Sequence, residues 1–337
     1  MKKAKYTGVL ITGIRDIRKA NHNLRSKAMD KALINASLEQ TGGVKNNTHL
    51  ARLPALRDFA RYIRQEEGVS RLNYITKNAV IRYGEVLKAK YESGIINHVT
   101  ARDYLSHVNV ALSQARGDDT LTVHATKELG YVPKSGIAQK DGSVPFSMHI
   151  EVKRSVSKEV ALVMTLQREF GLRFREASLF NAVDALKLID LGKTPAVKRG
   201  TKGGQARPMP VDTDLKYETL LKVVQYQLSN DTKSLIPSEH NFKSFQSMAW
   251  RETTTANPNY KSHGERKHFA CQYYLQHVGV PCPVQAKVPH GHPHHEFVAK
   301  QLGLPLNEVR ILDRRVRLAL SKLLGHHRVE VTNAYLG

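Results

Sequence analysis

Apolar residues recur at the spacing of an α-helix in several separate segments of this chain, and this pattern constrains its fold more than any other feature. In the first clear segment, which we expect to run from Thr48 to about Glu67, the apolar residues fall on one helical face. They are Leu50, Leu53, Leu56, Phe59, Ala60 and Ile63. Because such a helix is stable only when its apolar face is buried, several of them predict a helical bundle.

The rest of the N-terminal half follows the same pattern. We expect a second helix from 75 to 94 and a third from 100 to 117, where Thr100 and Asp103 resemble a capping box. A further helix is expected from 14 to 40, and its basic side chains form either a solvated face or an additional contact to a polyanion. These basic residues are Arg15, Arg18, Lys19, Arg25, Lys27 and Lys31.

The C-terminal half combines helices with one hairpin. The apolar stretch 160–166 predicts a buried helix followed by a turn at Gly171, and 307–324 predicts a capped helix. Paired glycines between basic residues in 198–210 predict the tight turn of a β-hairpin with Lys202 near its tip. The sequence therefore predicts a mainly α fold with a small antiparallel β-hairpin.

Length and composition divide the chain into two domains, because 337 residues can hold two separate cores. We expect a basic N-terminal segment at 1–45 and a helical domain at 46–118. A linker rich in Gly, Pro and polar residues follows at 119–154, and it would let two domains close around a duplex. The second domain is expected at 155–337, with an insertion around 280–305.

The charge of the chain gives the first indication of a partner. The formal net charge is +22, and a field of this strength attracts polyanions, so nucleic acid is the expected partner. A membrane surface is the competing explanation, but the sequence has no apolar run of about 18 residues and no signal-peptide core. The two cysteines, Cys271 and Cys282, form neither a zinc motif nor a disulfide framework, which indicates a reduced, cytoplasmic protein.

Four short motifs carry the chemistry. In the first, Arg173 follows Gly171 and Leu172, and an arginine fork can hold two phosphate oxygens without ever losing its charge. Glu176 lies three residues further on, within helical reach, and can orient that fork. The second motif is the hairpin that carries Lys202.

The third motif places His263 and Arg266 on one helical face. In the fourth, His326 follows a Leu-Gly pair and Tyr335 comes nine residues later. A tyrosine becomes a nucleophile when its phenol is assisted and the charge formed in attack is stabilised. Each of these residues alone is more simply explained as a surface, ion-paired or packed side chain. Their joint occurrence in this order favours a catalytic site.

The ordered set of motifs resembles the tyrosine recombinases of the phage and mobile-element integrase type. The Gly-Leu-Arg-x-x-Glu pattern of that family is matched at 171–176, its Lys-Gly-x-x-x-Arg-x-x-Pro hairpin at 202–210, its His-x-x-Arg box at 263–266, and its Leu-Gly-His with a later tyrosine at 324–335. The resemblance covers roughly residues 155–337. It implies a helical core-binding domain followed by a mixed α/β catalytic domain.

The resemblance also implies a reaction, a site and partners. Strand cleavage and rejoining through a 3′-phosphotyrosine would serve site-specific recombination, for which we expect no cofactor and no metal. The implied active residues are Arg173, Lys202, His263, Arg266, His326 and the nucleophile Tyr335, with Glu176 in support. Arg207 and Lys267 are expected DNA contacts. The expected partners are double-stranded recombination sites, a homotetramer on DNA and a DNA-bending accessory protein, in a cytoplasmic, nucleoid-associated setting.

Two features depart from the family pattern. Arg266 and His326 lie 60 residues apart, more than twice the usual interval, and the extra segment includes the histidine cluster 290–295. We interpret the cluster as a solvated, flexible loop, because the glycine and proline between its histidines disfavour a helical pair of metal ligands; a metal site is the alternative. Because Gly337 follows Tyr335 by two residues, we expect subunits to contact each other without a C-terminal segment, with the insertion as a candidate.

Three other functions stay open. A type IB topoisomerase shares the chemistry but swivels and reseals one strand, and the two-domain layout argues against it. A non-catalytic DNA-binding protein on the same fold would be expected to lose some of the active positions, which are all present. A metal-dependent nuclease that uses the histidine cluster would be inhibited by a chelator, whereas the tyrosine mechanism would not.

Overall fold

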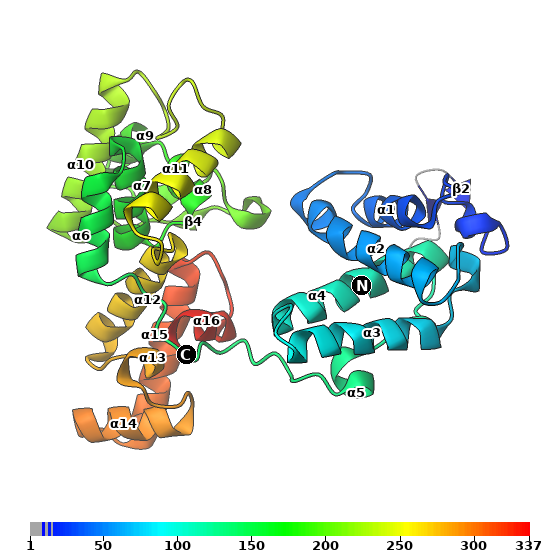
Figure 1. The fold of residues 1–337 in the computed structure, drawn as a ribbon. Helices are drawn as coiled ribbons and strands as arrows, with labels where there is room; N and C mark the ends of the chain where they lie inside the picture. Colours follow the sequence, from blue (N-terminus) through cyan, green and yellow to red (C-terminus); the bar gives the residue numbers. More distant parts are fainter. Residues whose placement is uncertain (1–8, 11–12, 15) are drawn as a thin grey trace. The chain divides into compact units, whose positions relative to one another are not determined.

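A computed structural model of the chain describes residues 9–10, 13–14 and 16–337 (Figure 1). Side chains are described from residue 16 onward, with the exception of Lys202. The chain divides into two compact units, Met1–Lys134 and Ser135–Gly337. Among the described residues, no helix is long and apolar enough to cross a membrane.

The N-terminal unit is a helical bundle in which α4 packs against α1, α2 and α3. Its elements are β1 (Val9–Leu10), β2 (Gly13–Ile14), η1 (Ala20–Asn23), α1 (Met29–Gln40), α2 (Asn47–Gln65), η2 (Leu72–Tyr74), α3 (Lys77–Glu92), α4 (His98–Arg116) and α5 (Ala125–Leu129). The strands β1 and β2 pair in antiparallel fashion, with Val9 opposite Ile14. In the core, the rings of Phe59 and Tyr83 meet edge to face with centroids 5.0 Å apart.

The three helices expected at 48–67, 75–94 and 100–117 are confirmed as α2, α3 and α4. The predicted apolar face of α2 is wrong at one position, because Leu50 is 50% exposed. Two polar residues, His49 and Arg52, are buried instead. Both meet polar side chains of α1: His49 Nδ1 lies 3.2 Å from the hydroxyl of Ser37, and Arg52 donates to Gln40 at 2.6 Å. These partners offset the cost of burying polar groups.

The helix expected at 14–40 is wrong in its first half. Helix α1 begins only at Met29, and the chain before it passes through left-handed conformations at Asn21 and His22, with φ of 50° and 54°. The Asn21 side chain accepts from the Leu72 amide at 2.8 Å and donates to Ser26, so it stabilises a loop in place of helix. Arg15, which was expected in this helix, lies outside the described residues.

The C-terminal unit holds two hydrophobic cores. Helices α7, α9, α10 and α11 surround the first, whereas α12, α15 and α16 surround the second. The elements are α6 (Phe146–Ser155), α7 (Lys158–Phe170), α8 (Phe174–Ser178), α9 (Ala182–Asp190), β3 (Ala196–Val197), η3 (Lys202–Gly204), β4 (Arg207–Pro208), α10 (Asp214–Ser229), α11 (Phe242–Ala256), α12 (His263–Val278), α13 (Pro283–Ala286), α14 (His292–Leu302), α15 (Leu306–Leu323), η4 (Val329–Thr332) and α16 (Asn333–Leu336). Because α7 and α12 pack against each other, the two cores are joined along that contact.

The predicted mainly α fold with a small antiparallel hairpin is confirmed. Strands β3 and β4 pair with Val197 opposite Arg207, and η3 lies at the turn between them. Helix α7 ends at Phe170, and the next residue, Gly171, has a φ of 61° that favours glycine. A Cβ at this position would also come within 2.4 Å of the Phe269 ring. The helix expected at 307–324 is α15, but no side chain caps its start, which follows Pro305.

The histidine cluster is not the expected flexible loop. His292 begins helix α14, and Pro293 fits in the first turn because no intrahelical donor is needed there. His294 is buried, and its Nε2 lies 2.9 Å from the carbonyl oxygen of Pro281. His292 contacts Glu296 one turn later at 3.3 Å. No group of three or more His, Cys, Asp and Glu side chains in the described part of the chain is arranged to hold a metal ion.

Helix α5 and all but the last residue of α6 lie within 119–154, the range expected as a linker. Helix α5 belongs to the N-terminal unit and α6 to the C-terminal unit, since the two units divide after Lys134. The extra segment around 280–305 contains α13 and α14, and α14 packs against α15.

The start of α4 provides a test of these assignments. The side chain of Asn97 accepts from the amide of Thr100 at 2.7 Å, so Asn97, and not the predicted Thr100, caps the helix. We expect Asn97→Ala to lower the free energy of unfolding by about 1 kcal/mol, the usual cost of losing such a cap. Thr100→Ala should change it much less. Urea unfolding of the full chain, followed by circular dichroism, measures both; equal losses would contradict this assignment.

Candidate active site

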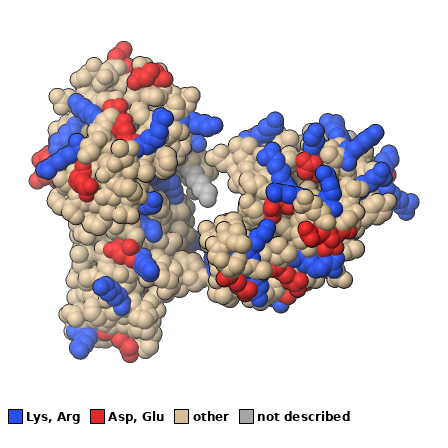
Figure 2. All heavy atoms as spheres, in the orientation of Figure 1, with Lys and Arg blue, Asp and Glu red and all other residues tan. Residues whose placement is uncertain are grey.

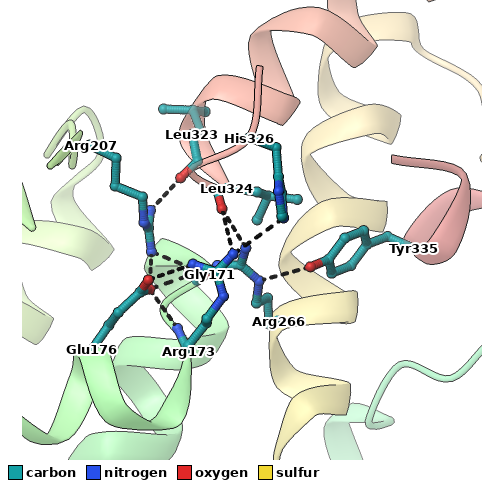
Figure 3. Close-up of polar contacts among 9 residues, drawn as sticks. All are labelled: Gly171, Arg173, Glu176, Arg207, Arg266, Leu323, Leu324, His326 and Tyr335. Atoms are coloured by element: carbon teal, nitrogen blue, oxygen red, sulfur yellow. Dashed lines mark hydrogen bonds and ion pairs between the residues drawn. The ribbon is translucent and has the colours of Figure 1, made fainter. Parts of the chain in front are cut away.

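A buried carboxylate, that of Glu176 on α8, lies at the centre of a cluster of arginines (Figure 3). Its Oε1 accepts from Arg173 at 2.6 Å, its Oε2 accepts from Arg207 at 2.7 Å, and Oε2 lies 3.9 Å from Nη1 of Arg266. Burial alone would raise the pKa of Glu176, but the charges of Arg207 and Arg173 outweigh it and hold this pKa below its ordinary value. The carboxylate therefore neutralises part of a strongly positive site.

Arg173 and Glu176 are positioned by the start of α8. The Arg173 amide donates to Oε2 of Glu176 at 2.8 Å, as in a capping box where the third residue of a helix reaches back to its cap. The guanidinium of Arg173 remains partly exposed, and its Nη2 lies 3.3 Å from Nε2 of His326 and 3.4 Å from the Leu324 carbonyl oxygen. The turn at Gly171 thus presents Arg173 to solvent beside His326.

Arg207, which was expected to contact DNA, is buried. From strand β4 it donates to Glu176, to the carbonyl oxygen of Leu323 and, at 3.4 Å, to that of Gly171. A side chain with those partners holds the end of α15 against the hairpin. The DNA contact of Arg207 stays a prediction.

Arg266 is fully buried on α12 and joins the two cores. It donates to the carbonyl oxygen of Gly171, to that of Leu324 at 2.5 Å, and through Nε to the phenol oxygen of Tyr335 at 3.2 Å. Burial lowers the pKa of Arg266 to about 10, which still leaves the side chain charged at neutral pH. The guanidinium of Arg266 therefore contacts both the backbone near Arg173 and the phenol of the predicted nucleophile, Tyr335.

Tyr335 lies on α16, with its side chain almost completely buried and its phenol oxygen directed at Arg266 (Figure 3). Its ring also lies next to that of His263, with centroids 5.7 Å apart. Although His263 is exposed, desolvation by the surrounding protein and then the charge of Arg266 lower the pKa of His263 to about 4. This imidazole is therefore neutral at physiological pH.

The remaining predicted residues are Lys202 and Lys267. Lys202 begins η3 at the tip of the hairpin, and its side chain lies outside the described part. Lys267 follows Arg266 on α12, and its side chain packs over Gly142. A Cβ added to Gly142 would come within 2.7 Å of Nζ of Lys267. The structure thus brings together Arg173, Glu176, His263, Arg266, His326 and Tyr335, whereas the DNA contact of Lys267 stays a prediction.

A second buried carboxylate, Glu265, was missed by the sequence reasoning although it lies inside the His-x-x-Arg box. It accepts from Arg168 of α7 at 2.7 Å, and its Oε1 lies 2.8 Å from Nδ1 of His149 on α6. Arg168 also donates to the Val144 carbonyl oxygen at 3.1 Å. These contacts fix the first turn of α12, and with it His263 and Arg266. His149 and Arg168 are too distant from Glu265 in the sequence for any motif spacing to indicate these contacts.

A second positioning residue that was missed is Arg317, buried on α15. It donates to Asp313 on its own helix at 3.0 Å, and to Asn333 at 3.1 Å and the Gly337 carbonyl oxygen at 3.2 Å. The last two contacts lie on either side of Tyr335. Arg317 therefore holds the segment that carries the phenol against α15.

Comparison with known proteins agrees with this geometry. Residues 135–276 match a family model described as Integrase. The resemblance to tyrosine recombinases is confirmed. This integrase match includes Arg173, the hairpin and the His-x-x-Arg box, and it ends before the segment of His326 and Tyr335. A comparison with curated proteins gives no match.

Solved integrase structures show the same fold. A lambda integrase dimer bound to a COC′ core site aligns over 83% of this chain and 76% of that chain, with a TM-score of 0.52 and 14% identity. A lambda integrase tetramer bound to a Holliday junction aligns over 85% and 78%, with a TM-score of 0.52 and 12% identity. The Tn1549 transposon integrase in complex with transposon right end DNA aligns over 92% and 95%, with a TM-score of 0.53 and 10% identity. At these identities the likeness establishes the integrase fold.

The arginine cluster predicts how stability depends on Glu176. We expect Glu176→Gln to lower the free energy of unfolding by about 3–5 kcal/mol at neutral pH, because buried arginines lose their counter-charge. Since the folded pKa is depressed, this stabilisation is complete above the ordinary value of 4.5 and disappears as the pH falls through the folded value. Urea unfolding between about pH 3 and pH 7 would show the difference from wild type shrinking at acid pH.

Glu308→Gln is the matched control for this test, because Glu308 is exposed on α15. It should leave stability nearly unchanged across the same pH range. A Glu176→Gln protein as stable as the control would mean that the carboxylate does not hold the cluster together.

Arg317 gives a prediction about the segment of Tyr335. We expect Arg317→Ala to accelerate amide hydrogen exchange in 329–337 by about tenfold or more, because a hydrogen bond to a charged group contributes ~1.5–3 kcal/mol. Exchange in the hairpin 196–208 should change little. Arg314→Ala is the control, since Arg314 is exposed one turn earlier on the same helix. Equal exchange in the two variants would show that Arg317 does not fix this segment.

Proposed function

We propose that this protein is a site-specific DNA recombinase of the integrase type that cuts and rejoins duplex DNA through a covalent bond to Tyr335. One observation carries the proposal: Nε of Arg266 lies 3.2 Å from the Tyr335 phenol oxygen, and the same guanidinium shares the Leu324 carbonyl oxygen with Arg173. A nucleophile and two cationic donors are thus gathered from α16, α12 and the turn before α8. That set matches the needs of phosphoryl transfer.

In the first step, the Tyr335 oxygen attacks the scissile phosphorus, and the bond from phosphorus to the 5′ oxygen breaks. Arg173 and Arg266 stabilise the negative charge that develops on the non-bridging oxygens, with a further hydrogen bond from His326. The product is a 3′-phosphotyrosine and a strand with a 5′-hydroxyl end. Removal of one phosphate-binding donor in a comparable site costs about a hundredfold or more in rate.

Two protons move in this step. His263, whose ring lies 5.7 Å from that of Tyr335, accepts the proton of the phenol. Lys202, placed by the hairpin turn, donates a proton to the departing 5′ oxygen. In the second step, a 5′-hydroxyl from another strand attacks the phosphotyrosine and reseals the DNA. The covalent intermediate conserves the bond energy, so the reaction needs neither ATP nor a metal.

Duplex DNA is the proposed partner. The net charge of +22 favours it, and Lys and Arg side chains are spread over both units on the face shown in Figure 2, with some Asp and Glu among them. We propose that both units bind DNA, and that the helical N-terminal unit does so as a core-binding domain. Because a lambda integrase is known as a tetramer on a Holliday junction and the Tn1549 integrase in complex with transposon DNA, we propose a DNA-bound homotetramer that moves a mobile element. A DNA-bending accessory protein would assist it.

Tyr335→Phe tests the proposal directly. The protein is incubated in EDTA with supercoiled DNA that carries the sequence flanking its own gene, and denaturation in SDS then reveals any protein bound covalently to DNA. We expect an adduct with the wild type and none with Tyr335→Phe, while DNA binding is retained. Arg173→Ala should form the adduct about a hundredfold more slowly. Tyr217→Phe, a change at an exposed tyrosine of α10, is the control that should leave it intact.

The other outcomes separate the competing functions. An adduct that persists in Tyr335→Phe would mean that another tyrosine attacks. DNA binding without any adduct would favour a non-catalytic DNA-binding protein, and cleavage that EDTA abolishes would favour a metal-dependent nuclease. Relaxation of supercoils without exchange between two sites would indicate a topoisomerase.

A further inference from the structure

A groove with a cavity volume of about 710 Å³ opens beside His263, between α7, α11 and the turn that precedes α12. Its floor is apolar and closely packed, because four of its lining side chains are almost completely buried. These are Val160, Met164, Ala249 and Tyr260. A concave apolar floor of this size is typical of a ligand site and has room for a nucleobase.

The edge of the groove carries Trp250, the single tryptophan of the chain. Its side chain projects from α11 and is 66% exposed. Tryptophan offers a large flat surface on which another flat group can stack, and most such side chains are far more buried. The groove thus combines a closed floor with an exposed aromatic surface at its edge.

The charged side chains that line the groove are basic. Lys243, Arg251 and Lys261 line it, and no lining residue is acidic. Lys243 and Arg251 lie on α11 with Trp250, one on each side of it in sequence, and Lys261 lies on the turn before α12. A flat apolar group that also carries negative charge matches this surface, and a nucleotide has both properties.

The position of the groove relates it to the cleavage site. His263 lines the groove, and its ring lies 5.7 Å from that of Tyr335. A group held in the groove would therefore lie beside the phosphate that Tyr335 attacks. In a duplex, however, the face of each base is covered by its neighbours, so only an unstacked base could enter.

We propose that this groove binds an unpaired nucleotide of the DNA strand next to the scissile phosphate. The base stacks on Trp250 over the apolar floor, and the three cations contact its phosphates. The inference rests on the proposed function, in which cleavage releases a strand that must leave its duplex before it can join another. A site for its unpaired end would favour strand exchange over immediate resealing.

The single tryptophan makes the test direct, because its fluorescence reports on the groove alone. The full-length protein is titrated with a ten-nucleotide thymidine strand and, separately, with a fully paired twenty-base-pair duplex. We expect the single strand to quench the emission to saturation, and the duplex to quench it much less at equal phosphate concentration. A variant of Trp250 then measures how much the stacking contributes to affinity.

Trp250→Ala should weaken single-strand binding, measured by fluorescence anisotropy of a labelled strand, by about five- to 150-fold, which corresponds to ~1–3 kcal/mol of base stacking. Its affinity for the paired duplex should change little. Leu228→Ala is the matched control, since Leu228 has the same 66% exposure but lies on α10 away from the groove. Lys243→Ala should weaken single-strand binding and make it less dependent on salt.

Two results would overturn the proposal. One is equal quenching by strand and duplex, with unchanged single-strand affinity in Trp250→Ala. The other is a change of emission with protein concentration in the absence of DNA, which would make the groove an interface between copies of the chain.

The adduct assay keeps this proposal separate from the proposed recombination. If Tyr335 forms its adduct while Trp250→Ala binds single strands like the wild type, the groove proposal fails and recombination stands. If no adduct forms but the single-strand preference depends on Trp250, the recombination proposal fails and the groove remains a nucleic-acid site.

Discussion

The geometry of the site depends on the burial of one negative charge among three positive ones. Glu176 contacts Arg173 and Arg207 directly, and Arg266 lies 3.9 Å from the same carboxylate. Three guanidinium groups could not be held this close together without a counter-charge, because their repulsion grows as water is excluded. The carboxylate thus allows the cationic site to exist within a folded protein. Two backbone carbonyls, those of Gly171 and Leu324, provide further hydrogen-bond acceptors for these guanidinium groups.

The same contacts connect the two cores of the C-terminal unit. Gly171 follows α7 of the first core, whereas Leu324 follows α15 of the second, and Arg266 donates to both carbonyl oxygens. The catalytic candidates therefore lie where two separately packed bodies meet, which is a common place for a site. Arg317 and Glu265 act one layer further out, since each fixes an element that carries an active side chain.

The sequence predicted those features that depend on local patterns. Helices α2, α3, α4 and α7 follow from apolar periodicity, and the hairpin follows from its glycines. The predictions that were wrong depended on partners distant in the chain. Leu50 faces solvent because His49 and Arg52 of α2 are buried in its place, where they pair with Ser37 and Gln40. His294 is buried because the carbonyl oxygen of Pro281 provides a hydrogen-bond partner for its ring. The DNA contact expected of Arg207 stays a prediction, and only the fold reveals that its guanidinium donates to Glu176. The spacing of a sequence motif identifies a candidate residue, but it does not determine which side chains surround that residue in the folded protein.

Besides their ionic contacts to Glu176, the arginines that face the proposed phosphate donate to uncharged acceptors. Arg266 donates to two carbonyl oxygens and a phenol, and Arg173 donates to the Leu324 carbonyl oxygen beside His326. These contacts hold each fork in position before any ligand arrives, which lowers the cost of ordering it on binding. A phosphate oxygen is a stronger acceptor than a neutral carbonyl, because a hydrogen bond between two charged groups is about twice as strong. We therefore expect the phosphate to displace the Leu324 carbonyl oxygen from both arginines. Because Leu324 immediately precedes the segment of His326, that exchange would couple phosphate binding to the position of the segment that carries Tyr335.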